Sequence, residues 1–185
     1  MVCVEGFEDG DQIQKAHVDQ YGIVSFKVYE YWLGDGWADQ DLMDVVGDDV
    51  GFSLGEAAWF ISGTAKQITT AGGVKKTPHT HTFNQTWSVV SSAFPINFCP
   101  NSADVSWAAQ DGDQIQVPWV DDYGIVQFNA YEYWTGEGWA DSAAMELLDA
   151  DSVITTAGKG FWYITSNPAD VSFAEVSPIA DPVTP

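Results

Sequence analysis

The sequence contains one long pattern twice. Residues 9–39 read DGDQIQKAHVDQYGIVSFKVYEYWLGDGWAD, and residues 111–141 read DGDQIQVPWVDDYGIVQFNAYEYWTGEGWAD. The segments lie 102 residues apart and are identical at 22 of 31 positions. A period near 100 residues is too long for a solenoid and is typical of tandem small domains. Two copies also favour a binding or structural module over an enzyme, because catalysis seldom needs its site twice.

Each copy has the residue pattern of β-structure. Runs rich in aromatic and β-branched residues, at 23–32 and 125–134, are followed by glycine-rich turns. Short strands at this spacing predict an all-β fold of two tandem β-sandwich (Ig-like) repeat domains. At most a short helix is expected in each, within residues 39–50 and 141–153. The expected division is a first repeat over 1–76, a linker over 77–82, a second repeat over 83–176 and a Pro-rich tail over 177–185.

The two repeats are not equally complete. Residues 82–94 add a strand signal ahead of the second repeat, and the first repeat has no counterpart of it. One interpretation is that the first repeat has a shorter sheet. The other is that its open edge is covered by the tail or by the second repeat of a neighbouring chain, through β-augmentation. Such a heterologous contact would generate a filament.

The aromatic residues could form the two cores or an exposed binding surface. The expected core residues of the two repeats are Ile23, Phe26, Trp32, Trp59, Ile61, Ile125, Phe128, Trp134, Trp162 and Ile164. Exposed Trp and Tyr rings stack on sugars or form protein interfaces. The expected binding or interface residues are Tyr29, Tyr31, Trp37, Tyr131, Tyr133 and Trp139.

Paired aspartates stand at equivalent turns of the two repeats. They are Asp9 with Asp11 and Asp111 with Asp113. Clustered carboxylates are ligands for Ca2+, but Asp-Gly is also a common tight-turn dipeptide. Turn formation is the favoured interpretation, a Ca2+ site is the alternative, and no other cofactor is expected.

The charge of the chain restricts its partners. The formal net charge is −21, and the chain contains no Arg. Because phosphate contacts need a basic patch, neither nucleic acid nor an anionic membrane is an expected partner. No apolar run of 18 residues and no signal peptide is visible, so membrane insertion is not expected. Cys3 and Cys99 are not equivalent in the repeat, and a disulfide could join them across a contact between chains.

No recognisable catalytic motif is present. The two histidines in PHTHT, His79 and His81, have no counterpart in the repeat pattern and are expected in a solvated linker. The sequence contains no GxSxG, HExxH, P-loop or GxGxxG pattern. The chain is therefore not expected to be an enzyme.

The second repeat carries a weak resemblance to known proteins. Its SAFP, DGDQIQ, GFWYI and SNPADVSFAE segments resemble the tandem β-sandwich repeats of large secreted or surface bacterial proteins. The resemblance implies an extracellular or cell-surface location and a structural role. The first hypothesis is a non-enzymatic structural protein that self-associates, as an oligomer or a filament formed by strand complementation. The alternative is a pair of carbohydrate-binding modules that use Trp and Tyr platforms on polysaccharide.

Overall fold

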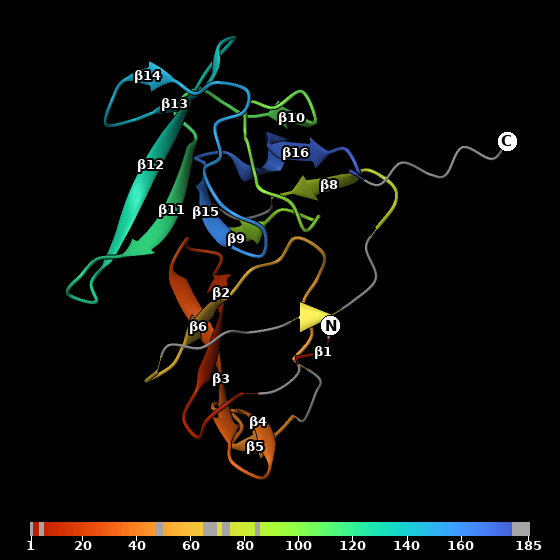
Figure 1. Ribbon diagram of the computed structural model, residues 1–185, viewed down its shortest axis with the longest axis vertical. Helices are drawn as coiled ribbons and strands as arrows, with labels where there is room; N and C mark the ends of the chain where they lie inside the picture. Colours follow the sequence, from red (N-terminus) through yellow and green to blue (C-terminus); the bar gives the residue numbers. More distant parts are fainter. Residues whose placement is uncertain are drawn as a thin grey trace, which may run out of the picture.

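The computed structural model describes residues 2–3, 6–46, 50–64, 70–71, 75–83 and 86–178. Within these residues the chain forms antiparallel β-sheets (Figure 1), and the predicted all-β class is confirmed. The described part contains no α-helix, and its one short helical element is the 3-10 turn η1 (Pro168–Asp170). None of its helices is long and apolar enough to cross a membrane.

Both repeats build the same sheet. The first repeat has strand order β5-β4-β3-β2-β6, formed by β2 (Gln12–Val18), β3 (Val24–Trp32), β4 (Gly36–Asp39), β5 (Asp44–Val45) and β6 (Trp59–Ile61). The second has order β14-β13-β12-β11-β15-β9, formed by β9 (Trp87–Ser91), β11 (Gln114–Val120), β12 (Val126–Trp134), β13 (Gly138–Asp141), β14 (Glu146–Leu147) and β15 (Gly160–Ile164). The second sheet thus has β9 as an additional strand.

Two smaller sheets complete the fold. In the second repeat, β10 (Val105–Ala108), β16 (Ser172–Glu175) and β8 (His79–Thr82) pair in the order β10-β16-β8. In the first repeat, β1 (Val2–Cys3) pairs with β7 (Thr70–Ala71). The segment expected as a linker, residues 77–82, therefore contains a strand, and this expectation is corrected. Its pairing partner lies more than 90 residues later, so the local sequence does not reveal it.

The repeated residues explain the repeated hairpins. Gln12 pairs with Glu30 across β2 and β3, and Gln114 pairs with Glu132 across β11 and β12. At the turn of the second hairpin, Asp121 Oδ1 accepts hydrogen bonds from the backbone amides of Tyr123 and Ile125, both at 2.9 Å. The equivalent aspartate of the first hairpin makes the same two contacts. These Asx turns fix the strand register by local hydrogen bonding.

The short helices expected after the hairpins are absent from the described residues. In their place, Asp141 Oδ1 accepts the amides of Ala143 and Ala144, and the Met145 amide donates to the Asp141 carbonyl. Met145 has a φ of 57°, which is a left-handed conformation that stops a helix after one turn. The chain then continues as β14.

The core of the second repeat lies between its two sheets. Pairing register places Ile115, Tyr131 and Tyr163 on the inner face of the six-stranded sheet. Trp107 of β10 stacks on Tyr163 at 5.7 Å, which shows that the smaller sheet covers this inner face. The largest fully buried side chains are Trp139, Tyr163, Phe98, Phe161 and Phe173.

The predicted core is wrong for half of its members. Five of the ten residues are exposed: Ile23, Phe26, Ile61, Ile125 and Phe128. Trp162 is buried as predicted, and Trp32, Trp59, Trp134 and Ile164 are partly buried. In the second repeat, Phe128 and Trp162 share the outer face of the six-stranded sheet, opposite the smaller sheet, whereas Ile125 lies in the turn before β12. The sequence pattern therefore placed Phe128 in the core although it stands on the face that the smaller sheet does not cover.

Candidate functional site

The two repeats are joined through one shared strand. The Ser91 amide donates to the Gly55 carbonyl at 2.8 Å, and the Ala57 amide donates to the Val89 carbonyl at 3.4 Å. Glu56 forms a bridge with Val90 between these bonds. The other edge of β9 pairs with β15. Residues 55–57 of the first repeat therefore obtain from the same chain a strand partner that one of the two interpretations of the sequence assigned to a neighbouring chain. Most of the tail, residues 179–185, lies outside the described residues.

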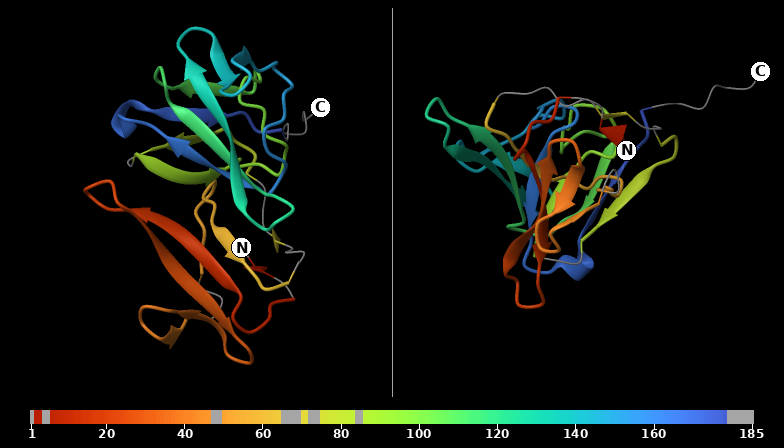
Figure 2. Two further views of the ribbon diagram at one scale, coloured as in Figure 1. Left: turned by 90° about the vertical axis from the view of Figure 1, so that its left-hand side faces the viewer. Right: turned by 90° about the horizontal axis from the view of Figure 1, so that it is seen from below.

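An aromatic contact lies beside this junction. The Phe26 ring on β3 packs edge-on against Trp162 on β15, with a centroid distance of 6.3 Å. Trp87 on β9 packs against another side of Trp162 at 6.0 Å. Figure 2 shows the β2–β3 hairpin, in red and orange, reaching toward the second repeat. The face of the first hairpin that carries Phe26 is thus a packing surface for the second repeat.

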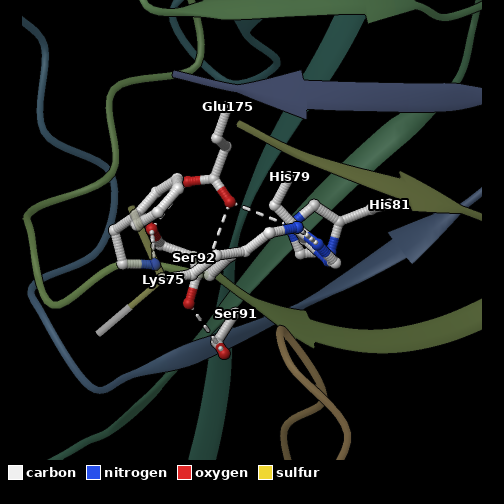
Figure 3. A network of polar contacts seen from close by, with 8 residues as sticks. Lys75, His79, His81, Ser91, Ser92 and Glu175 are labelled. Carbon is white, nitrogen blue, oxygen red and sulfur yellow. Dashed lines mark hydrogen bonds and ion pairs between the residues drawn. The ribbon is translucent and has the colours of Figure 1, made fainter. Parts of the chain in front are cut away.

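The most buried polar cluster also lies at the junction (Figure 3). Glu175 and His81 are both buried, and His81 Nε2 lies 2.8 Å from Glu175 Oε2. The same Oε2 accepts the Ala93 amide at 2.8 Å, and Oε1 accepts the Ser92 hydroxyl at 2.6 Å. His81 stacks on Phe173 at a centroid distance of 4.0 Å. A buried carboxylate is tolerated because every contact here is a hydrogen-bond donor to it.

This cluster does not have the geometry of a hydrolase. In a catalytic triad the histidine lies between the serine and the acid, so that it can take the serine proton. Here the carboxylate of Glu175 lies between Ser92 and His81, and each of them contacts it separately. Burial alone would raise the pKa of Glu175, but hydrogen bonds from His81, Ala93 and Ser92 outweigh burial and lower that pKa. The cluster is a structural network that holds β8, β16 and the segment after β9 together.

His79 lies at the edge of the cluster and is more accessible. Its ring meets the ring of His81 edge-on at 4.5 Å, and its Nδ1 lies 3.2 Å from Lys75 Nζ. Burial lowers the pKa of His79, and the charges of His81 and Lys75 lower it further. These two histidines were expected in a solvated linker, and their packing corrects that expectation. The packing of the two histidines depends on β16, which follows much later in the sequence and supplies Phe173 and Glu175.

The paired aspartates form turns. Asp9 Oδ1 accepts the Leu33 amide and Asp111 Oδ1 accepts the Thr135 amide. Asp11 and Asp113 accept the backbone amides of residues 8 and 110, both at 2.8 Å. The described residues contain no group of three or more His, Cys, Asp or Glu side chains that could hold a metal ion.

One of these aspartates has an additional partner. Asp113 Oδ2 accepts the hydroxyl of the buried Tyr163 at 2.6 Å. Burial and this carboxylate raise the pKa of Tyr163. The second repeat thus fixes its turn to the core, whereas the equivalent of Tyr163 in the first repeat is Phe60, which has no hydroxyl.

The six expected binding aromatics are not on one open surface. Trp37, Tyr131 and Trp139 are buried, and Trp139 has no exposed surface. The other three, Tyr29, Tyr31 and Tyr133, are partly buried. Tyr133 packs edge-on against Trp139 at 5.4 Å, and Tyr31 packs in the same way against Trp37 at 5.5 Å. The structure therefore brings four of the six together, as one packed pair within each repeat.

The two cysteines are in different environments. Cys99 is a free thiol, 3.7 Å from the Asp151 carbonyl, and burial raises its pKa. Cys3 belongs to β1, and its side chain lies outside the described residues.

Sequence reasoning missed the exposed apolar surface of the second hairpin. The hairpin patch is formed by Val120, Val126 and Phe128 on one face of the hairpin, while the exposed Trp119 lies on the opposite face and Tyr123 and Ile125 lie at the tip. Phe128 is 44% exposed, and Val120 is 63% exposed although its equivalent Val18 is only 5% exposed. The β11–β12 hairpin projects from the body of the second repeat, at the left in Figure 1. Contiguous exposed apolar patches on soluble proteins commonly mark interaction sites.

Comparison with protein-family models, with curated proteins and with solved structures finds no match for this chain. The function must therefore be argued from the chain's own geometry.

Proposed function

We propose that this is a non-enzymatic structural protein that self-associates through the hairpin patch. The observation that carries the proposal is the contact of Phe26 with Trp162 inside the chain. Phe128 is the equivalent of Phe26, and it is exposed on the corresponding strand of the second repeat. In the first repeat, the hairpin face that carries Phe26 packs on the second repeat of the same chain. A second copy of this chain is therefore the partner that best fits the equivalent exposed face around Phe128.

The receiving surface would be the first repeat of the next chain. Trp59 is the equivalent of Trp162 and lies on β6, where it is partly buried. Ile61, two residues along the same strand and therefore on the same face, is exposed. In the proposed contact, Phe128 of one chain packs on Trp59 of the next, as Phe26 packs on Trp162. Such a head-to-tail contact repeats and gives a ring or a filament.

Charge would make this association depend on salt. The chain carries a formal charge of −21, and two acidic residues, Asp121 and Asp122, lie at the tip of the second hairpin. Like charges on two approaching chains repel one another, and salt screens that repulsion over about 8–10 Å at ordinary ionic strength. We therefore expect association to strengthen as NaCl is raised. A saline extracellular or cell-surface setting suits this behaviour and agrees with the repeat resemblance.

The alternative is the expected pair of carbohydrate-binding modules. The six aromatic residues first considered give it less support, because three of them are buried and two others, Tyr31 and Tyr133, pack against neighbouring rings. A platform for a sugar ring needs an open aromatic face.

Sedimentation velocity over a concentration series tests the proposal. We expect the mean sedimentation coefficient of the wild type to rise with protein concentration and with NaCl, and negative-stain images to show rings or filaments. Phe128→Ser should remove the rise, whereas Leu33→Ser, at an exposed apolar residue outside the hairpin patch, should leave it unchanged. A wild type that stays monomeric throughout would contradict the proposal.

A further inference from the structure

We infer that the second repeat binds a neutral saccharide in a hollow on the outer face of its six-stranded sheet. The hollow has a volume of about 340 Å³, and its lining includes Trp87, Gln114, Gln116, Ile164 and Ser166. Small-molecule sites generally measure about 300–1,000 Å³, so its size suits one or two sugar rings. This inference does not depend on self-association.

The apolar wall of the hollow comes from a cross-strand pair. Trp87 on β9 lies directly opposite Ile164 on β15. Trp87 is partly buried, and its ring makes an edge-on contact with Trp162 at 6.0 Å, which restricts its orientation. A tryptophan held in one orientation loses little side-chain entropy when a ligand binds. It can therefore present a ring to the apolar face of a sugar.

The polar wall comes from two neighbouring glutamines. Gln116 Nε2 donates to Gln114 Oε1 at 3.2 Å. The other two amide atoms, Gln114 Nε2 and Gln116 Oε1, take no part in this hydrogen bond. Neither atom has a hydrogen-bond partner within the described part of the chain. Together they offer one donor and one acceptor side by side. A sugar hydroxyl both donates and accepts, so a pair of adjacent hydroxyls fits this arrangement.

The first repeat carries the same glutamine pair with a different set of hydrogen bonds. Gln14 donates to Gln12 at 3.0 Å, as in the second repeat, but Gln12 Nε2 also donates to Glu30 at 3.4 Å. Gln40 donates to the same carboxylate, and its equivalent in the second repeat is Ser142. The amides of the first repeat are thus engaged internally, and this repeat provides a matched control.

The negative charge around the hollow favours neutral saccharides over anionic ones. Asp111 and Asp113 both line the hollow, and the whole chain is strongly acidic. Uronic acids and sulfated sugars would be repelled. A neutral hexose or pentose oligomer meets no such penalty.

Isothermal titration calorimetry tests this inference with cellohexaose, mannohexaose and xylohexaose, and with trigalacturonate as the anionic probe. We expect at least one neutral oligosaccharide to bind with one site per chain, and trigalacturonate not to bind. Trp87→Ala should weaken binding at least about tenfold, as expected for a tryptophan at the centre of a contact. Gln14→Leu in the first repeat should leave the affinity unchanged.

A second variant separates loss of binding from loss of folding. Gln114→Leu with Gln116→Leu keeps the side-chain volume on an outer face and should preserve the circular dichroism spectrum and the melting temperature. It should nevertheless weaken binding by about tenfold, because the sugar hydroxyls then lose their partners. The inference is overturned if none of the three neutral sugars binds, if trigalacturonate binds as well as they do, or if the folded double variant binds with unchanged affinity.

Discussion

His81 Nε2 lies 2.8 Å from Glu175 Oε2, although the two residues are 94 positions apart in the sequence. The contact joins β8 to β16, and the Gly55 backbone of the first repeat packs against the imidazole ring. One buried pair thus connects two of the three strands of the smaller sheet with the junction between the repeats. We expect the stability of the chain to depend strongly on this pair.

Replacing Glu175 by Gln should destabilise the second repeat substantially. The substitution removes the charge that satisfies His81, Ser92 and the Ala93 amide. Breaking a buried pair by changing one partner costs about 3–5 kcal/mol. Urea unfolding followed by circular dichroism measures this loss, with Glu146→Gln on an exposed strand as the control that should change little. Equal midpoints for both variants would show that the buried pair contributes no stability.

Acid should destabilise the fold in two stages. Burial, His81 and Lys75 lower the pKa of His79 below its ordinary value of 6.5, so the unfolded chain binds a proton there before the folded chain does. Stability should therefore decline as pH falls below about 6.5. Although burial opposes it, the hydrogen bonds to Glu175 lower its pKa below the ordinary value of 4.5, so a further decline begins as pH falls through that region.

Melting temperatures measured from pH 8 to pH 3 test this expectation. His79→Gln should flatten the upper stage and leave the lower stage in place. A melting temperature that stays constant between pH 7 and pH 5 in the wild type would contradict the assignment of the upper stage to His79.

A glycine at the junction, Gly55, can be compared with the equivalent glycine of the second repeat, Gly158. Gly55 and its equivalent Gly158 have φ values of +78° and +80°. A Cβ added at Gly158 would meet no atom within 4 Å, whereas one added at Gly55 would lie 2.0 Å from His81 Cε1. Gly158→Ala should therefore cost only the strain of a left-handed alanine, about 1–2 kcal/mol. Gly55→Ala should cost about 1–3 kcal/mol more, because His81 must move. Chemical denaturation measures both, and equal losses would show that the Gly55–His81 contact is unimportant.

The sequence predicted the strands better than the packing. The Asx turns, the glycine turns and the β-branched runs are local, so the β2–β3 and β11–β12 hairpins could be located from residues alone. Which face of a strand is buried depends on what covers it. Phe128 and Tyr131 are both aromatic and stand on opposite faces, and only the smaller sheet on the Tyr131 side determines that Phe128 is exposed. Pairing of His81 with Phe173 across β8 and β16 is likewise not visible in either segment alone.

For the candidate sites, too, the sequence predicted local features better than features formed by strands distant in sequence. The turn role of Asp9, Asp11, Asp111 and Asp113 depends on local hydrogen bonds and was the favoured interpretation. The hairpin patch and the hollow beside Trp87 depend on strands distant in sequence. The missing counterpart of β9 in the first repeat was the one sequence signal that pointed to the junction.

Calcium can be separated from turn formation at Asp113. Asp113→Asn should lower the free energy of unfolding by about 1–3 kcal/mol, because the Tyr163 hydroxyl and the Gln110 amide lose a charged acceptor. The loss should be the same with and without EDTA at constant ionic strength. Tyr163→Phe should cause a comparable loss, which confirms the partner. A wild-type melting temperature that falls with EDTA, in a way that Asp113→Asn abolishes, would instead support a Ca2+ site.

The head-to-tail contact of Phe128 with Trp59 is tested most directly by mixing two defective chains. Phe128→Asp removes the donating surface and keeps Trp59, whereas Trp59→Ser removes the receiving surface and keeps Phe128. Ile61→Asp, at an exposed neighbour of Trp59, serves as a second receiving-surface variant if Trp59→Ser melts early. Circular dichroism establishes that each variant is folded before mixing.

Sedimentation velocity should show each variant alone as a monomer at a concentration where the wild type forms larger species. An equimolar mixture should form a dimer and grow no further, because Phe128 of the Trp59→Ser chain packs on Trp59 of the Phe128→Asp chain and both remaining ends are blocked. A mixture that stays monomeric while the wild type associates would contradict the head-to-tail contact, and a wild type that never associates would contradict self-association itself.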